Sequence, residues 1–329
     1  MSTKMLSLEA KNLVNLDKPT QKNPRAAVLI CQSVEENIED YDSFRQYLEE
    51  ADLAVYIYSY HDTKTTKDSP QEDCNSDPNI STIIQDVMEL RTSISTNHGN
   101  IPVLLFGYSF GTIIALSTLI NFPQKFSGIV LWNLGPSLER YSCLLTTFIL
   151  KAEKFFKGSD TPSRFMRQMT SDLQNHENQN RQIFCKDSPS NPTESANNRK
   201  CYDHQLNIPV SIWLELMSMA TEINSRGSFS SLSRSTSFCL IDGGNTMTAT
   251  LDYSQTHNLA NRLQKEEFYD ISLMAFPPIQ PHLLHPKNPF RAMESLRRWI
   301  VESYLPQVIP LISHDKNSSD DNLNNLHHI

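Results

Sequence analysis

The chain has 329 residues, 39% of them hydrophobic, which is enough apolar material to bury a core in one large domain or two ordinary ones. Lys and Arg number 29 against 37 Asp and Glu, and no basic run offers a surface for phosphate backbones, so nucleic acid is excluded as an expected partner. No segment approaches the roughly 18 apolar residues of a membrane span, and the opening "MSTKMLSLEAKNLVN" lacks the apolar core of a signal peptide.

We therefore expect a cytoplasmic protein without a transmembrane segment, and export by a route without a cleaved signal stays open. The six cysteines are scattered, with no CxxC and no Cys/His pair at zinc-ligand spacing. Free thiols are expected, and neither a metal nor a cofactor is predicted.

Short apolar runs, rich in β-branched and aromatic residues, predict the strands of a buried sheet. In chain order they span residues 26–30, 53–60, 103–106, 128–132, 237–241 and 270–276. Apolar residues at helical spacing predict a helix from about Tyr41, a second capped by Asn79 or Ser81, a third after the third strand, and a last one from Phe290 to Tyr304. Strands that alternate with helices imply an α/β fold, with a mostly parallel sheet flanked by helices.

The alternation breaks after the fourth strand, which predicts an inserted, mainly helical cap at 136–235 between core segments 1–135 and 236–312. We expect the polar stretch 172–207 to be a loop and the tail 313–329 to be disordered. The start of the cap predicts an amphipathic helix whose apolar side chains cover an acyl chain or pack against the sheet. These are Leu144, Leu145, Phe148, Ile149, Phe155 and Phe156.

The stretch "LLFGYSFGTIIAL" places Ser109 between the third strand and the next helix. A GxSxG sequence is common by chance, but this setting predicts a tight turn that exposes the serine above the sheet as a nucleophile. Gly107 and Gly111 are then required because side chains there would collide as the turn closes. The Phe110 amide, at the helix N-terminus, is the expected donor to an oxyanion.

A serine hydroxyl is a weak nucleophile unless a base takes its proton, and histidine is the usual base. In the chain order of α/β-hydrolases the base follows the last strand, where His282 and His285 stand. The acid should follow the fifth strand, where Asn245 occupies the expected position and Asp242 lies three residues earlier. The alternative position, after the fourth strand, holds Asn133.

From about residue 25 to 304, the chain resembles the α/β-hydrolases of the monoacylglycerol lipase, lysophospholipase and serine aminopeptidase group. The blocks "RAAVLICQ", "IPVLLFGYSFGTIIAL" and "PHLLHPKNPFRAMESLRRWI" carry the resemblance. It implies that His282 is the base, once Trp299 is aligned with the tryptophan of the closing helix. It also implies that the Ser33 amide is the second oxyanion donor. The chain departs from the pattern at Cys31 and Gln32, where the family has His-Gly.

Two functions from different classes stay open. The first is a serine hydrolase that cleaves a carboxylic ester of a lysophospholipid, a monoacylglycerol or a similar lipid, with Ser109 as nucleophile, His282 as base and Asn245 or Asp242 as the orienting residue. The second is a catalytically impaired hydrolase that serves as a lipid-binding or protein-interaction module. The expected partners are a small lipid or ester substrate, with transient contact to a membrane surface and a protein partner at the cap as additional hypotheses.

Overall fold

The computed structural model describes residues 23–34, 38–59, 81–134, 140–159, 161–169, 208–243, 254–276 and 290–310. Within these residues six strands form one sheet in the order β2-β1-β3-β4-β5-β6, and all neighbours are parallel. The strands are β1 (Ala26–Cys31), β2 (Leu53–Tyr58), β3 (Val103–Tyr108), β4 (Gly128–Trp132), β5 (Ser237–Gly243) and β6 (Ile271–Phe276). The α/β class is thus confirmed, and the predicted strand ends shift by only a few residues.

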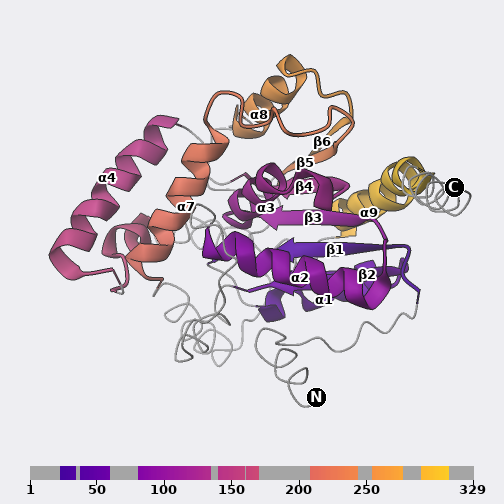
Figure 1. The fold of residues 1–329 in the computed structure, drawn as a ribbon, viewed down its shortest axis with the longest axis horizontal. Helices are drawn as coiled ribbons and strands as arrows, with labels where there is room; N and C mark the ends of the chain where they lie inside the picture. The colour runs from indigo at the N-terminus through magenta and orange to yellow at the C-terminus, as the bar shows by residue number, and fades with distance from the viewer. Residues whose placement is uncertain are drawn as a thin grey trace, which may run out of the picture.

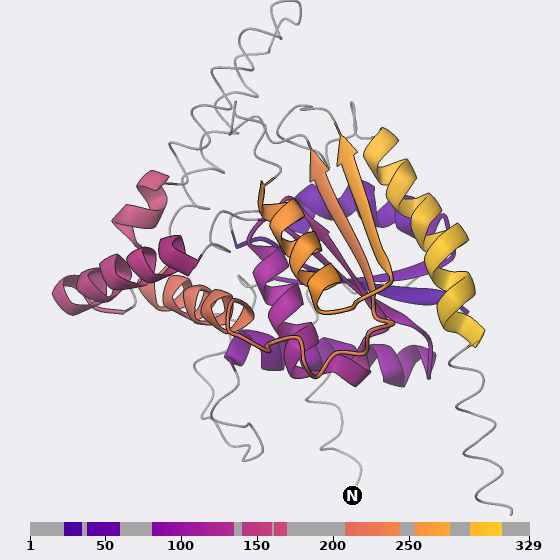
Figure 2. The same ribbon diagram turned by 90° about the horizontal axis from the view of Figure 1, so that it is seen from above.

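Helices cover both faces of this sheet (Figures 1 and 2). One face is covered by α2 (Thr82–His98), α3 (Gly111–Asn121) and α8 (Ser254–Lys265), and the other by α1 (Asp42–Glu49) and α9 (Phe290–Arg298). A short 3-10 turn, Ile38–Tyr41, precedes α1, another, Pro123–Lys125, follows α3, and a π-helical stretch, Trp299–Tyr304, continues α9. A cluster of buried apolar side chains fills the space between each face of the sheet and its helices. Because side chains alternate along a strand, each inner strand contributes to both clusters.

The helices begin and bury their faces much as the sequence predicts. Ser81 is the N-cap of α2, where its hydroxyl accepts a 3.2 Å hydrogen bond from the Ile83 amide, an interaction typically worth about 1 kcal/mol. The alternative cap, Asn79, lies outside the described residues. The predicted inner face of the closing helix is buried: Met293, Leu296, Ile300 and Tyr304.

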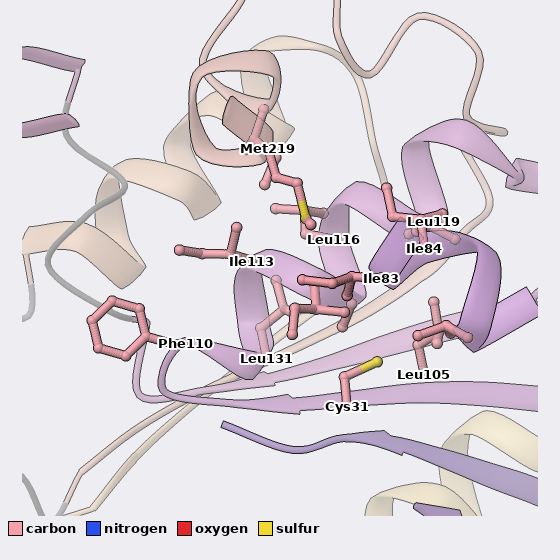
Figure 3. Close-up of a cluster of buried hydrophobic side chains, with 14 of the residues drawn as sticks. Cys31, Ile83, Ile84, Leu105, Phe110, Ile113, Leu116, Leu119, Leu131 and Met219 are labelled. Atoms are coloured by element: carbon pink, nitrogen blue, oxygen red, sulfur yellow. The ribbon is translucent and has the colours of Figure 1, made fainter. Parts of the chain in front are cut away.

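The described residues between β4 and β5 include the helices α4 (Arg140–Lys157) and α7 (Val210–Ile223), with a short helical segment at 164–169. Helix α7, which the sequence analysis missed, packs on α3, and Figure 3 shows Met219 above Leu116 at this contact. Two carboxylates of α7 also accept hydrogen bonds from residues of α3 and from the start of α2. Glu222 accepts hydrogen bonds from Ser117 Oγ at 3.3 Å and Asn121 Nδ2 at 3.2 Å, and Glu215 accepts from Ser81 and Thr82.

One expectation for α4 is wrong. Its apolar side chains do not pack against the sheet, because the helix lies on the far side of α7 (Figures 1 and 2). Five of the six predicted residues are exposed. The cap boundaries, 136–235, remain a prediction. The stretch 172–207 and the tail 313–329 lie outside the described residues. Among the residues that are described, no helix is long and apolar enough to cross a membrane.

Candidate active site

Ser109 lies at the turn from β3 to α3 in a backbone conformation that serine rarely adopts. Its φ is +51°, in the left-handed region, which costs an L-residue other than glycine roughly 1–2 kcal/mol. The turn is held on both sides, because the Ser109 amide donates to the Trp132 carbonyl at 3.1 Å and the Ser109 carbonyl accepts from the Thr112 amide at 3.0 Å. Such strain persists only where the surroundings fix it, as at the nucleophile turn of an α/β-hydrolase.

The two glycines of the motif are required by close backbone contacts. A Cβ atom on Gly107 would lie 2.6 Å from both the Gly111 carbonyl oxygen and the Thr112 Cα. A Cβ atom on Gly111 would lie 2.0 Å from the Cys31 carbonyl oxygen. The turn after β1 therefore lies directly against the start of α3. This contact brings the segment that contains Ser33 next to the serine turn.

Among the described residues, the amides of the two predicted oxyanion donors make no backbone–backbone hydrogen bond. Within the described residues, neither the Phe110 amide nor the Ser33 amide donates a hydrogen bond to a backbone carbonyl, whereas the amide of Gln32, directly before Ser33, donates to the Tyr58 carbonyl at 3.2 Å. The Ser33 hydroxyl is also buried without a hydrogen-bond partner among these residues. Buried polar groups usually have hydrogen-bond partners, and the assignment of the Phe110 and Ser33 amides as oxyanion donors stays a prediction from the sequence.

Phe110 is anchored by a residue that the sequence analysis missed. Its ring packs edge-to-face on Trp213 of α7, with ring centroids 5.0 Å apart and an interplanar angle of 75°. Both side chains are buried. The signal was present in "VSIWLELMSMATEI", whose apolar residues recur at helical spacing. Trp213 therefore links α7 to the residue that follows the predicted nucleophile.

The carboxyl ends of β3, β4 and β5 form a continuous edge. Asn133, directly after β4, also has a φ of +51°, and its amide donates to Ile241 at 2.9 Å. Since Trp132 is in register with Ile241, Asp242 lies at the level of Asn133 and Ser109, two strands from the serine. Asp242 is half-buried. The described residues thus place one predicted carboxylate at the same edge as Ser109.

The remaining predicted site residues lie outside the described residues: His282, His285 and Asn245. Their assignment as base or orienting residue stays a prediction from the sequence.

Two buried thiols, Cys31 and Cys239, are unsuited to act as nucleophiles, and no metal cluster is found in the part of the chain that the structure describes. Burial raises the pKa of the Cys31 thiol far above its ordinary value, and burial followed by the nearby Asp270 charge does the same for Cys239. Both thiols therefore stay protonated at neutral pH, so neither supplies a thiolate nucleophile. No group of three His, Cys, Asp or Glu side chains in these residues is arranged to hold a metal ion.

The sequence of residues 22–266 matches the family model described as serine aminopeptidase, S33. The chain belongs to this S33 family of α/β-hydrolases. The matched region of this S33 hydrolase contains Ser33, Ser109 and Asp242, and it ends before His282. No curated protein sequence matches the chain.

Solved structures show that the S33 chain shares its fold with esterases and lipases. A carboxyl esterase from Bacillus coagulans superposes with a TM-score of 0.63 at 15% identity, over 86% of this chain and 91% of the esterase. A lipase in an open form superposes with a TM-score of 0.64 at 15% identity, over 87% of this chain and 91% of the lipase. A soluble variant of the Saccharomyces cerevisiae monoglyceride lipase superposes with a TM-score of 0.53 at 11% identity, over 87% of this chain and 89% of the lipase. At such identities the likeness concerns the fold alone.

Proposed function

We propose that the protein is a serine hydrolase that cleaves a carboxylic ester of a lipid-like substrate, a monoacylglycerol or a lysophospholipid, through an acyl-Ser109 intermediate. The observation that carries the proposal is the strained left-handed Ser109, enclosed by the close contacts of Gly107 and Gly111. Membership of the S33 family supports hydrolase chemistry at this serine.

The proposed reaction begins with attack of the Ser109 hydroxyl on the ester carbonyl, while His282 takes the hydroxyl proton. The amides of Phe110 and Ser33 donate to the carbonyl oxygen as it becomes negative, which stabilises the tetrahedral intermediate. The carbon–oxygen bond of the ester then breaks, and the proton on His282 passes to the departing alcohol. Water attacks the acyl-serine by the same route, which releases the fatty acid and restores the hydroxyl.

The lipid part of the proposal rests on the apolar residues where α3 and α7 meet, together with the resemblance to lipases. Trp213 and Phe110 meet edge-to-face beside the serine turn, and Ile113 and Met219 continue the apolar contact between α3 and α7 (Figure 3). An acyl chain favours apolar and aromatic surroundings of this kind near the reacting carbonyl.

The substrate class is tested by the release of fatty acid. We expect the purified protein to liberate fatty acid from monoacylglycerol or lysophosphatidylcholine, and to leave aminoacyl amides of similar size uncleaved. Quantification of free fatty acid by mass spectrometry decides the outcome. Cleavage of the amides alone would replace the lipid esterase by a peptidase, whereas no cleavage of either class would favour the non-catalytic binding module.

The orienting residue is tested by a matched pair of variants. Because only Asp242 carries a charge that stabilises an imidazolium, we expect Asp242→Asn to lower kcat for p-nitrophenyl esters by on the order of a hundred-fold or more. Asn245→Ala should change kcat by less than about ten-fold, since its loss removes no charge. The reverse ranking would assign the orienting role to the Asn245 carbonyl, and equally small effects would exclude both residues.

A further inference from the structure

The outer surface of α4 exposes a continuous set of large apolar side chains. Five of them are between 58% and 85% exposed, and at 100° per residue they fall within an arc of roughly 120° on the helix. We call this set the α4 apolar face. It consists of Leu144, Leu145, Phe148, Phe155 and Phe156.

The opposite side of α4 is packed, so the orientation of the helix is fixed. Cys143, Thr146 and Leu150 are buried there, and the Cys143 Sγ contacts the Met217 carbonyl at 3.3 Å and Thr221 Oγ1 at 3.4 Å on α7. Since α7 is in turn bonded to α2 and α3, the apolar face is held outward at one end of the molecule (Figures 1 and 2). Soluble chains rarely expose contiguous apolar patches of this kind without a partner.

Helix α4 is positively charged, and Lys151 borders the apolar face, although the chain as a whole has a net charge of −8. Lys151, Lys154 and Lys157 are exposed on the same helix, and Arg164 is exposed just beyond its end. The one acid of α4, Glu153, already binds Lys157 at 2.9 Å and the Arg164 amide at 3.1 Å, and it also accepts from the Ser163 hydroxyl. The helix therefore has no uncommitted carboxylate to offer to another cation.

We propose that the α4 apolar face docks on the surface of an anionic lipid bilayer. Phenylalanine and leucine side chains enter the boundary between head groups and acyl chains, while the lysines bind anionic head groups. A second copy of this chain fits the face less well, because two such helices would bring lysines together without a carboxylate to pair with them. This docking goes beyond the proposed function, since it requires no turnover at Ser109.

The test is the binding of the full-length protein to vesicles. We expect sedimentation with vesicles of phosphatidylcholine and phosphatidylserine in equal amounts, and at least about ten-fold weaker binding to phosphatidylcholine alone. Phe155→Ser with Phe156→Ser should weaken binding to the anionic vesicles about ten-fold or more, and Lys151→Glu with Lys154→Glu should do the same. Because these side chains are exposed, the variants should keep the wild-type unfolding midpoint, which circular dichroism can verify.

Matched controls use exposed residues elsewhere on the molecule. Tyr269→Ser with Leu273→Ser removes exposed apolar side chains near β6, and Lys125→Glu with Lys265→Glu makes the same charge change away from α4. Both controls should bind vesicles like the wild type. The proposal is overturned if wild-type protein ignores anionic vesicles, or if the controls lose as much binding as the α4 variants. A dimer that Phe155→Ser with Phe156→Ser dissociates, without vesicle binding, would assign the face to a second copy.

Discussion

Replacement of Ser109 by alanine should abolish covalent labelling by a fluorophosphonate probe and lower ester turnover on the order of a thousand-fold or more. The probe bonds to a serine oxygen only when a base has activated it, so the variant loses the one atom with which the probe reacts. The rate that remains is expected to come from the two proposed oxyanion amides and from substrate positioning, which a methyl group leaves in place. Intact-mass spectrometry measures the labelling, and p-nitrophenyl ester release measures the turnover.

Ser117→Ala is the matched control for this experiment. Ser117 lies on the same helix, and its hydroxyl binds Glu222 on the side of α3 that faces α7. The control should therefore label at close to the wild-type rate, with only a small loss of stability. His282→Ala should behave like Ser109→Ala if His282 is the base. Wild-type protein that stays unlabelled through a long incubation would contradict catalysis at Ser109 and favour the binding module.

The serine turn around Ser109 could be predicted from the sequence because local steric rules determine its backbone conformation. A serine between two glycines, after a buried strand and before a helix, has few conformations available, and the structure shows the backbone contacts that require both glycines. The sheet was predictable for a similar reason, since strands buried on both faces form unbroken apolar runs.

Contacts between distant segments were not predictable in the same way. The sequence did not predict α7 and α8, although each carries apolar residues at helical spacing, because strand signals and polar composition dominate the segment between β4 and β6. The contact between Phe110 and Trp213 joins residues that are far apart in the chain, and no local rule pairs them. The expected packing of the α4 apolar side chains against the sheet was wrong, because an apolar pattern at helical spacing does not identify the surface that the helix contacts.

Replacement of Gly111 by alanine should destabilise the fold and displace the serine turn. In an ordinary helix this change would favour folding by about 1 kcal/mol, because alanine has the higher helix propensity. Here the added Cβ would lie 2.0 Å from the Cys31 carbonyl oxygen, a backbone atom of a central strand, so either β1 or α3 must move. Overpacking of a well-packed interior typically costs 1–3 kcal/mol, and we expect a net loss of at least about 2 kcal/mol in the free energy of unfolding.

Gly158→Ala separates this contact from the general effect of adding a methyl group. Gly158 has open space around it, so alanine there meets only the penalty of its φ of +92°, about 1 kcal/mol. The free energy of unfolding measured by urea denaturation should therefore be much lower for Gly111→Ala than for Gly158→Ala. In the protein that remains folded, only Gly111→Ala should slow fluorophosphonate labelling. Because the same displaced contact carries the Ser33 segment, the loss of labelling must exceed the loss of folded protein. If Gly111→Ala were as stable and as reactive as wild type, the tight approach of β1 to α3 would be wrong, and the proposal of the Ser33 amide as an oxyanion donor would lose its support.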